Sequence, residues 1–321
     1  MSDGISSRIE TKWVRGMRIG LIDVDGHNYP NLPLMKISAW HKAKGDSVEW
    51  YQPMFSGHMD KVYVSKVFSF TPDYEYFIDA DEVEYGGTGY AISLVDGKEV
   101  YDQSKNKELP YEIEHTYPDY GLYGITDTAY GFLTRGCPRG CSFCHVGNKE
   151  GRCSIKVADL SEFWRGQKKM VLMDANILAC REHLDLLEQL ANSGAMVDIN
   201  QGLDARLLND KNMELIKRIK LSSVHFAWDR MVDSDRIKEN LIKFKEETGL
   251  GHRKVAVYIL TNYDTTFEED LERIEFCRSI DFSPYPMIYD KQHAHKKYKQ
   301  LQRWCSGFIF WKVKSFEEYV A

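Results

Sequence analysis

The sequence contains no apolar run long enough to cross a membrane, because none reaches the roughly 18 residues that a spanning helix needs. Its first residues also lack the basic start and apolar core of a secretory signal. Basic residues are not in excess: 42 lysines and arginines stand against 48 acidic residues, for a net charge of −6. Such a charge disfavours the broad basic surface that unspecific nucleic-acid binding requires. We therefore expect a cytoplasmic protein with neither a membrane partner nor a nucleic-acid partner.

A disulfide pattern is also missing. Three of the seven cysteines, Cys137, Cys141 and Cys144, lie within eight residues, and the other four are scattered along the chain. A disulfide framework would space its cysteines more evenly and would need an oxidising compartment. The close group of three instead predicts a metal site.

The sequence does contain alternating strand and helix patterns. The first region, residues 1–100, opens with a strand pattern over 17–24 and a helix pattern over 34–44 that stops at Gly45. Three more strand-like segments follow at 48–53, 61–68 and 77–87. This order predicts a small doubly wound, Rossmann-like α/β domain. Residues 101–125 hold few periodic apolar positions and predict a linker.

A second pattern, over residues 126–290, repeats the strand–helix unit six times. The predicted strands are 128–136, 168–176, 196–202, 222–229, 254–262 and 282–290, and the predicted helices are 157–166, 181–194, 209–220, 234–249 and 265–280. Six such units predict a partial (β/α)6 barrel of the TIM type, whose chemistry lies at the carboxyl ends of the strands. Residues 291–321 form a C-terminal extension, basic and then aromatic, for which we expect a solvated helix followed by an edge strand or lid.

The three cysteines follow the first predicted barrel strand, in the segment TRGCPRGCSFCHVG (134–147). A 4Fe–4S cluster used for electron transfer takes four thiolate ligands, so three leave one iron with an open position for a reacting ligand. The alternatives are a zinc site with His145 as a fourth ligand and three unrelated thiols. No second cysteine pair follows to complete such a site.

At these residues the chain resembles the radical S-adenosylmethionine superfamily, whose motif is C-x3-C-x-aromatic-C after the first barrel strand. Phe143 fills the aromatic place, and the resemblance covers residues 125–290. It implies a 4Fe–4S cluster on Cys137, Cys141 and Cys144, with S-adenosylmethionine chelating the fourth iron and Phe143 against the adenosine. One electron, from a donor such as flavodoxin or ferredoxin, then cleaves the cofactor, and the resulting 5′-deoxyadenosyl radical abstracts a hydrogen atom from the substrate.

The resemblance also places polar residues at other strand ends near the cofactor. Asp174 follows the second strand, where the family has a Gly-Gly-Glu-like element; both glycines are missing here, and the alternative is a capping aspartate. Gln201, Asp204 and Arg206 follow the third strand, with an Asp–Arg pair that locks a loop as the alternative. Asp229 follows the fourth strand, where the family often has a polar contact.

Residues 25–30 of the first region are similar to the D-x-H-x-x-G element of cobalamin-binding domains. Pro30 stands in place of the final glycine and supplies neither a flexible turn nor a backbone donor. Ser65 and the glycine pair at 86–87 occupy the places of later elements, at short spacings. We expect a reduced cobalamin-type domain. Cobalamin is a third candidate cofactor, but Pro30 argues against its binding. The alternative is a substrate-binding or capping domain.

The substrate is expected to be a small molecule, because neither a second cysteine cluster nor a basic RNA-binding appendage follows the barrel. Nineteen tyrosines and seven tryptophans suit stacking on a flat heterocycle such as queuine, from which a radical lyase would regenerate a deazapurine precursor. Candidate substrate contacts are His27, Asn28 and Tyr289, although Tyr289, like Tyr258, also suits a packing role. The alternatives are a cobalamin-dependent radical methylase, which is a transferase, and a metal-stabilised binding module without enzymatic activity.

Overall fold

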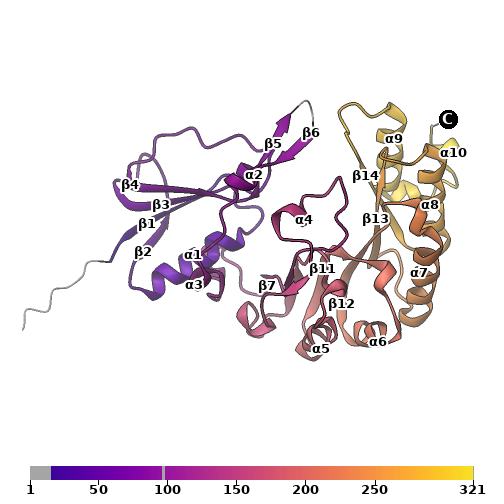
Figure 1. Cartoon of the computed structure of the whole chain (residues 1–321), viewed down its shortest axis with the longest axis horizontal. Coiled ribbons are helices and arrows are strands. Elements are labelled where there is room, and N and C mark those ends of the chain that lie inside the picture. The colour runs from indigo at the N-terminus through magenta and orange to yellow at the C-terminus, as the bar shows by residue number, and fades with distance from the viewer. Residues whose placement is uncertain (1–15, 96–97, 321) are drawn as a thin grey trace, which may run out of the picture. The chain divides into compact units, whose positions relative to one another are not determined.

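The structure is a computed structural model that describes residues 16–95 and 98–320. It is a mixed α/β protein that divides into two compact units (Figure 1). The first unit comprises Met1–Thr88 and Lys107–Asp119, and the second comprises Gly89–Asn106 and Tyr120–Ala321. Residues 101–125, expected as a linker, are thus shared between both units. In the described part of the chain, no helix is both long and apolar enough to cross a membrane.

The first unit is built on a four-stranded parallel sheet in the order β2-β1-β3-β4. Its elements are β1 (Arg18–Asp23), α1 (Leu32–Ala43), β2 (Ser47–Trp50), β3 (Met59–Ser65), β4 (Ala80–Gly86) and α3 (Tyr111–Glu114). Asn31 caps α1 by accepting from the Leu34 amide at 3.2 Å. Helix α1 then buries Leu34, Met35 and Ile37, as the apolar spacing of this segment requires.

The predicted parallel strands of the first unit are present, but only one of their three connections contains a helix. Helix α1 joins β1 to β2, whereas loops join β2 to β3 and β3 to β4 in the described chain. Asp25 fixes the second loop, because its carboxylate accepts from the Val67 amide at 2.5 Å and from the Thr71 hydroxyl at 2.7 Å. The first unit is therefore a parallel α/β sheet with one long covering helix, less complete than the doubly wound domain we expected.

The second unit is built on a six-stranded parallel sheet whose strands lie in chain order, β7-β10-β11-β12-β13-β14. These strands are β7 (Thr128–Gly131), β10 (Lys169–Leu172), β11 (Met196–Leu203), β12 (Lys220–Ala227), β13 (Val255–Thr261) and β14 (Ser283–Ile288). The connecting helices are α5 (His183–Ser193), α6 (Asp210–Arg218), α7 (Ser234–Thr248) and α8 (Phe267–Ser279).

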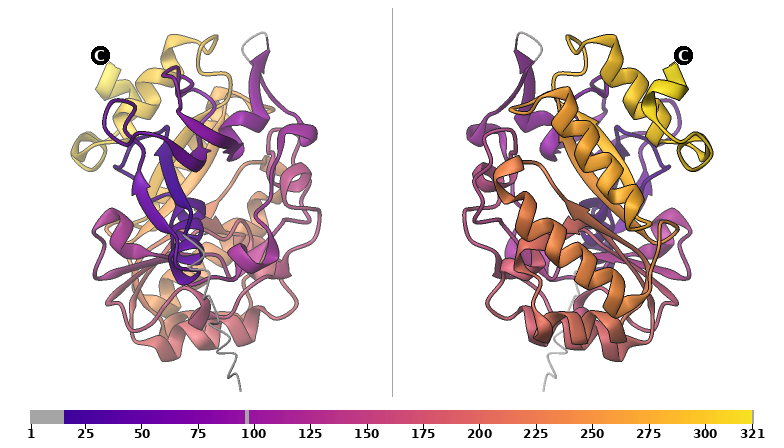
Figure 2. Two further views of the ribbon diagram at one scale, coloured as in Figure 1. Left: turned by 90° about the vertical axis from the view of Figure 1, so that its left-hand side faces the viewer. Right: turned by 90° about the vertical axis from the view of Figure 1, so that its right-hand side faces the viewer.

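Alternate residues of these strands are buried beneath the helices. Val224 and Phe226 of β12 are fully buried, and the Phe226 ring packs edge-on against Phe244 of α7, with ring centroids 4.9 Å apart. The residue between them, His225, points to the other face and is only partly buried. Figure 2 (right) shows α7 and α8 lying over one face of the sheet. One face is therefore core, and the other carries polar and aromatic side chains.

The helix predicted over residues 157–166 is wrong. The amides of Val157 and Ala158 both donate to the Leu133 carbonyl, so this segment is held extended beside the start of the cysteine loop. Only the short 3₁₀ helix η3 (Leu160–Glu162) forms there. The Phe163 ring lies against Gly131, where a Cβ atom would meet it at 2.3 Å.

Smaller elements complete the second unit. The hairpin strands are β5 (Ile92–Val95) with β6 (Lys98–Tyr101) and β8 (Thr134–Arg135) with β9 (Ile155–Lys156). The short helices are α4 (Val146–Lys149), η1 (Gln103–Lys105), η2 (Tyr120–Tyr123), η4 (Ile177–Ala179), η5 (Ala205–Leu207) and η6 (Met231–Asp233). Helix α2 (Thr88–Ala91) lies at the boundary of the two units.

The C-terminal extension is helical, formed by α9 (Lys296–Cys305), η7 (Phe308–Trp311) and α10 (Phe316–Val320). Trp304 is fully buried and its ring contacts Phe310 and Phe316. Arg278 of α8 donates to the Phe310 carbonyl at 2.6 Å. The edge strand expected here is absent from the described residues because these aromatic side chains pack onto the outer helix layer.

Candidate metal and cofactor site

The cysteine loop begins at a turn that only glycine can form. Gly136 has a φ angle of +85°, and a Cβ atom at this position would lie 2.1 Å from the Cys153 carbonyl oxygen. The next residue, Cys137, donates its amide to the Gly151 carbonyl at 3.1 Å, and Glu150 accepts from the Gly136 amide at 3.2 Å. The loop is therefore closed at its base by the β8–β9 hairpin, and the three cysteines lie on a fixed turn.

The three thiols lie within electrostatic reach of one another and of Asp229. Desolvation raises the pKa of Cys141, and the charges of Asp229 and of the other two cysteines raise it further. The pKa of Cys144 is raised by desolvation and by the charges of Cys137, Asp229 and Glu150. Such thiols are poor free nucleophiles, whereas a metal would displace their protons. In the described chain, no three His, Cys, Asp or Glu side chains could hold a metal ion between them.

Asn176 is a site residue that we did not predict. It follows β10 and is 3% exposed. Its Nδ2 atom lies 3.5 Å from the Cys137 sulfur and 3.5 Å from the Asp204 carboxylate, and its Oδ1 atom is buried without a hydrogen-bond partner. A buried amide oxygen without a partner is costly, and it favours a donor group that the described residues do not supply. The sequence signal was present, since Asn176 lies two residues beyond Asp174, on the same alternation.

Asp174 anchors the entry to the cysteine loop. It is 1% exposed, and its carboxylate accepts from the Leu133 amide at 3.1 Å and from the Thr134 hydroxyl at 2.7 Å. Burial outweighs these bonds and raises the pKa of Asp174 to about 6. The geometry gives Asp174 a positioning role between β10 and the loop. The predicted contact with a cofactor amino group would compete with these hydrogen bonds.

Asp204 and Arg206 form the ion pair that we considered as an alternative, and the pair also reaches the cysteine loop. Arg206 Nε lies 2.7 Å from Asp204 Oδ1, and Arg139 Nε of the loop lies 2.6 Å from Asp204 Oδ2. Burial opposes ionisation, but the bonds and charges of Arg206 and Arg139 lower the pKa of Asp204. Arg206 also pairs with Asp233 at 2.6 Å. By contrast, Gln201 is exposed.

Aromatic side chains connect the cysteine loop with the last two strand ends. The Phe143 ring meets Tyr263 edge-on, with centroids 5.2 Å apart, and Tyr263 meets Tyr289 at 4.8 Å. The hydroxyls of Ser142 and Tyr263 are hydrogen-bonded. Asp229, after β12, is half-buried, and burial raises its pKa. The structure therefore gathers Phe143, Tyr289 and Asp229 at the strand-end edge that the sequence indicated.

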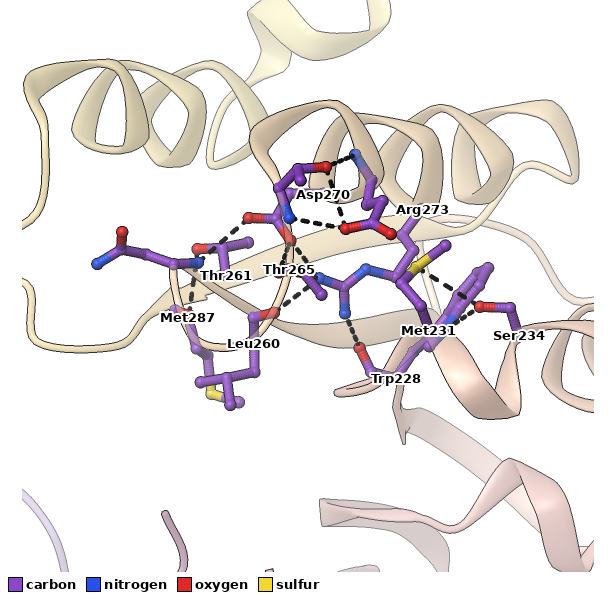
Figure 3. A network of polar contacts seen from close by, with 12 residues as sticks. Trp228, Met231, Ser234, Leu260, Thr261, Thr265, Asp270, Arg273 and Met287 are labelled. Carbon is purple, nitrogen blue, oxygen red and sulfur yellow. Dashed lines mark hydrogen bonds and ion pairs between the residues drawn. The ribbon is translucent and has the colours of Figure 1, made fainter. Parts of the chain in front are cut away.

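A buried network that we also missed fixes two of these strand ends (Figure 3). Arg273 of α8 is fully buried and donates to the Trp228 carbonyl at 2.6 Å and to the Leu260 carbonyl at 2.8 Å. It also forms an ion pair with Asp270, which accepts from the Asn262 amide at 3.2 Å. Arg273 thus joins the ends of β12 and β13, one residue before Asp229 and two residues before Asn262.

The predicted substrate residues lie in different units. His27 and Asn28 are exposed in the first unit, where the His27 ring lies 4.1 Å from Trp50, and Tyr289 belongs to the second unit. Ser65, placed in a cobalamin-type element, accepts from Asn31 at 2.8 Å in the core of the first unit. In this structure Ser65 and Asp25 form hydrogen bonds within the first unit.

Comparisons with known proteins add no relative. No model of a protein family matches the chain, and no curated protein matches it. Its functional assignment therefore depends on its own residues and their geometry.

Proposed function

We propose that the second unit is a radical S-adenosylmethionine enzyme, with a 4Fe–4S cluster on Cys137, Cys141 and Cys144. The observation that carries the proposal is the environment of the cysteine loop. Three thiols lie on one closed turn after the first strand of a parallel sheet, and the buried Asn176 amide points its Nδ2 atom at the first of them. An amide donor to a thiolate is the kind of outer contact that tunes an iron–sulfur site.

The arrangement of the sheet supports the proposal. Six parallel strands in chain order, with helices on one face, are what a partial (β/α)6 barrel of the TIM type would have. Asn176, Asp204, Asp229 and Tyr263 each follow a strand of this sheet. Because the carboxyl ends of parallel strands meet at one edge, these residues and the cysteine loop share the edge where such folds carry their chemistry.

The donor set fits the cluster better than it fits zinc. In a 4Fe–4S cube each thiolate binds a different iron, so three ligand sulfurs do not converge on one point. A tetrahedral zinc ion would require that convergence. When bound, the cluster and S-adenosylmethionine would supply an electron and a 5′-deoxyadenosyl radical that abstracts a hydrogen atom from the substrate. The unpartnered Oδ1 of Asn176 would accept from a donor on this cofactor.

The chain's own residues would hold and orient these groups. The Asp204 carboxylate fixes the loop through Arg139 and balances the buried charge of Arg206. Phe143 and Tyr263 would flank the adenosine, and Asp229 would keep negative charge beside the cluster ligands. The electron would come from an external donor such as flavodoxin or ferredoxin, and the substrate would be a small molecule. The observed bonds of Asp25 and Ser65 give no support to cobalamin.

The experiment is anaerobic reconstitution of the full chain with iron and sulfide. We expect a chain that binds iron and sulfide in equal amounts, with Cys137→Ser, Cys141→Ser and Cys144→Ser each losing the cluster. Cys153→Ser is the matched control, because Cys153 is exposed near the loop and is not among the proposed ligands. If none of the three variants loses iron, the proposed cluster is contradicted. If a stable cluster forms but S-adenosylmethionine is never cleaved, the result favours the non-enzymatic binding module.

A further inference from the structure

The face of the six-stranded sheet opposite its helices carries a group of polar and aromatic side chains that the site above does not use. This group, the open face, consists of Asp198, Ser223, His225, Tyr258 and Tyr285. Tyr285 is 51% exposed, and the side chains of Asp198 and His225 are 29% and 19% exposed. These residues alternate along β11–β14 with buried positions such as Ile199 and Phe226, so the strand pleat directs them together.

Hydrogen bonds within the open face orient its two acceptors. His225 Nδ1 lies 3.0 Å from the Ile199 carbonyl oxygen, which can only accept, so Nδ1 carries a proton and Nε2 of the neutral ring is an acceptor. Ser223 donates to Asp198 Oδ1 at 2.6 Å. Among the described residues, neither His225 Nε2 nor Asp198 Oδ2 has a hydrogen-bond partner.

The aromatic rings of the open face form a stack with one accessible member. His225 and Tyr258 are parallel, with centroids 4.9 Å apart and an interplanar angle of 5°, and Tyr258 meets Tyr285 edge-on at 5.5 Å. Tyr258 donates to the Asn200 carbonyl at 3.0 Å. Burial, with the negative charge of Asp198, raises the pKa of Tyr258 to about 12, so its hydroxyl stays neutral. Tyr285 then presents a half-exposed ring at the edge of a rigid stack.

The charge of the open face restricts its ligand. Asp198 is the acidic side chain of this group, and the lysine that shares this face of β11–β14, Lys220 at the first residue of β12, directs its Nζ to the Gly194 carbonyl at 3.2 Å rather than to Asp198. A phosphate or carboxylate would meet a carboxylate without a cation to offset it. A planar ring with N–H groups would instead satisfy Asp198 and His225 while stacking on Tyr285.

We infer that the open face binds a small planar nitrogen heterocycle as the free base, with N–H donors directed at Asp198 Oδ2 and His225 Nε2. This inference rests on the proposed function, for which it names the substrate class. It also assigns the recognition to the sheet of the second unit rather than to His27 and Asn28 of the first.

The test uses 2-aminopurine, whose fluorescence is quenched when it stacks on an aromatic ring. The full chain is titrated without iron, so that binding does not depend on the cluster. We expect saturable quenching, a dissociation constant about tenfold larger in Asp198→Asn and in Tyr285→Ala, and at least about tenfold weaker binding of the riboside 5′-monophosphate. His252→Gln is the matched control, because His252 pairs with Asp281 away from this face.

Absence of saturable quenching, binding that Asp198→Asn and His225→Phe both leave unchanged, or equal binding of the monophosphate would each overturn the inference. Circular dichroism of each variant establishes that the chain is folded. If the base binds but no S-adenosylmethionine is cleaved after reconstitution, the proposed function fails and the binding site stands. If cleavage occurs without base binding, the reverse holds.

Discussion

The Nδ2 atom of Asn176 lies 3.5 Å from the sulfur of Cys137, although 39 residues separate them in the chain. The same side chain leaves its Oδ1 atom buried without a partner. One residue therefore offers a donor to a predicted cluster ligand and an acceptor to a predicted cofactor. A residue kept only for packing would not need either polar group, since leucine offers the same branching at Cγ with apolar atoms.

Asn176→Leu should separate these roles. We expect the free energy of unfolding of the iron-free variant to lie within about 1 kcal/mol of the wild-type value, because an unpaired buried oxygen is removed together with a weak contact. Cluster loading or cofactor cleavage should fall about 10- to 100-fold, as for other outer contacts of metal ligands. Urea unfolding and iron analysis measure the two effects, with Asn192→Leu as a surface control. A large loss of stability with normal loading would indicate a packing role.

Gly136→Ala should prevent the cysteine loop from closing. The new Cβ atom would lie 2.1 Å from the Cys153 carbonyl oxygen at a residue with φ of +85°. We expect loss of iron binding after reconstitution. In the control, Gly147→Ala, the nearest atom to the new Cβ is 3.7 Å away, and iron binding should be retained. Equal iron content in both variants would show that the turn at Gly136 does not set the site.

Asp174 should make the iron-free protein less stable as the pH rises. Its pKa is about 6 in the folded chain against 3.8 for an ordinary aspartate, so the folded state binds the proton more tightly. The contribution of Asp174 to the free energy of unfolding is greatest below pH 3.8 and is lost as the pH rises through about 6. The difference between the two pKa values corresponds to about 3 kcal/mol. Urea unfolding between these pH values should show this slope in the wild type and a flatter one in Asp174→Asn. Parallel slopes would contradict the assignment.

The Arg273–Asp270 pair should behave as a buried, coupled pair. Arg273→Met leaves the Asp270 carboxylate buried without its counter-charge and should cost about 3–5 kcal/mol. The double variant Arg273→Met/Asp270→Leu should recover part of that loss, because the unpaired charge is gone. Denaturant unfolding of the two single variants and the double variant measures the coupling free energy between the side chains. Additive losses would show that the two side chains are not coupled.

Much of the sheet was predictable because each parallel strand has its own apolar run. The pattern at 222–229 locates β12, and Gly249 marks the end of α7 with a φ of +65°. The helix predicted over residues 157–166 does not form, because hydrogen bonds to Leu133 override its helical spacing. No local sequence pattern reveals these hydrogen bonds. The strand-end rule indicated Asp204 and Asp229, whereas Phe143 came from the cysteine motif.

The contacts of the site were harder to predict than its location. Asn176 lies two residues beyond Asp174, but its importance depends on a cysteine 39 residues away in the sequence. Arg273 was not singled out from the sequence, yet it is fully buried. Its partners include the carbonyls of Trp228 and Leu260, and backbone acceptors are invisible in a sequence.

The most direct test of the account is the electron paramagnetic resonance spectrum of the dithionite-reduced, reconstituted chain, recorded with and without S-adenosylmethionine. Direct coordination of the cofactor to the open iron predicts a changed cluster signal on addition, with 5′-deoxyadenosine formed in the same sample. Asn176→Leu should weaken the change, and Cys153→Ser should retain it. A cluster signal that S-adenosylmethionine leaves unchanged, with no 5′-deoxyadenosine released, would contradict the proposed function.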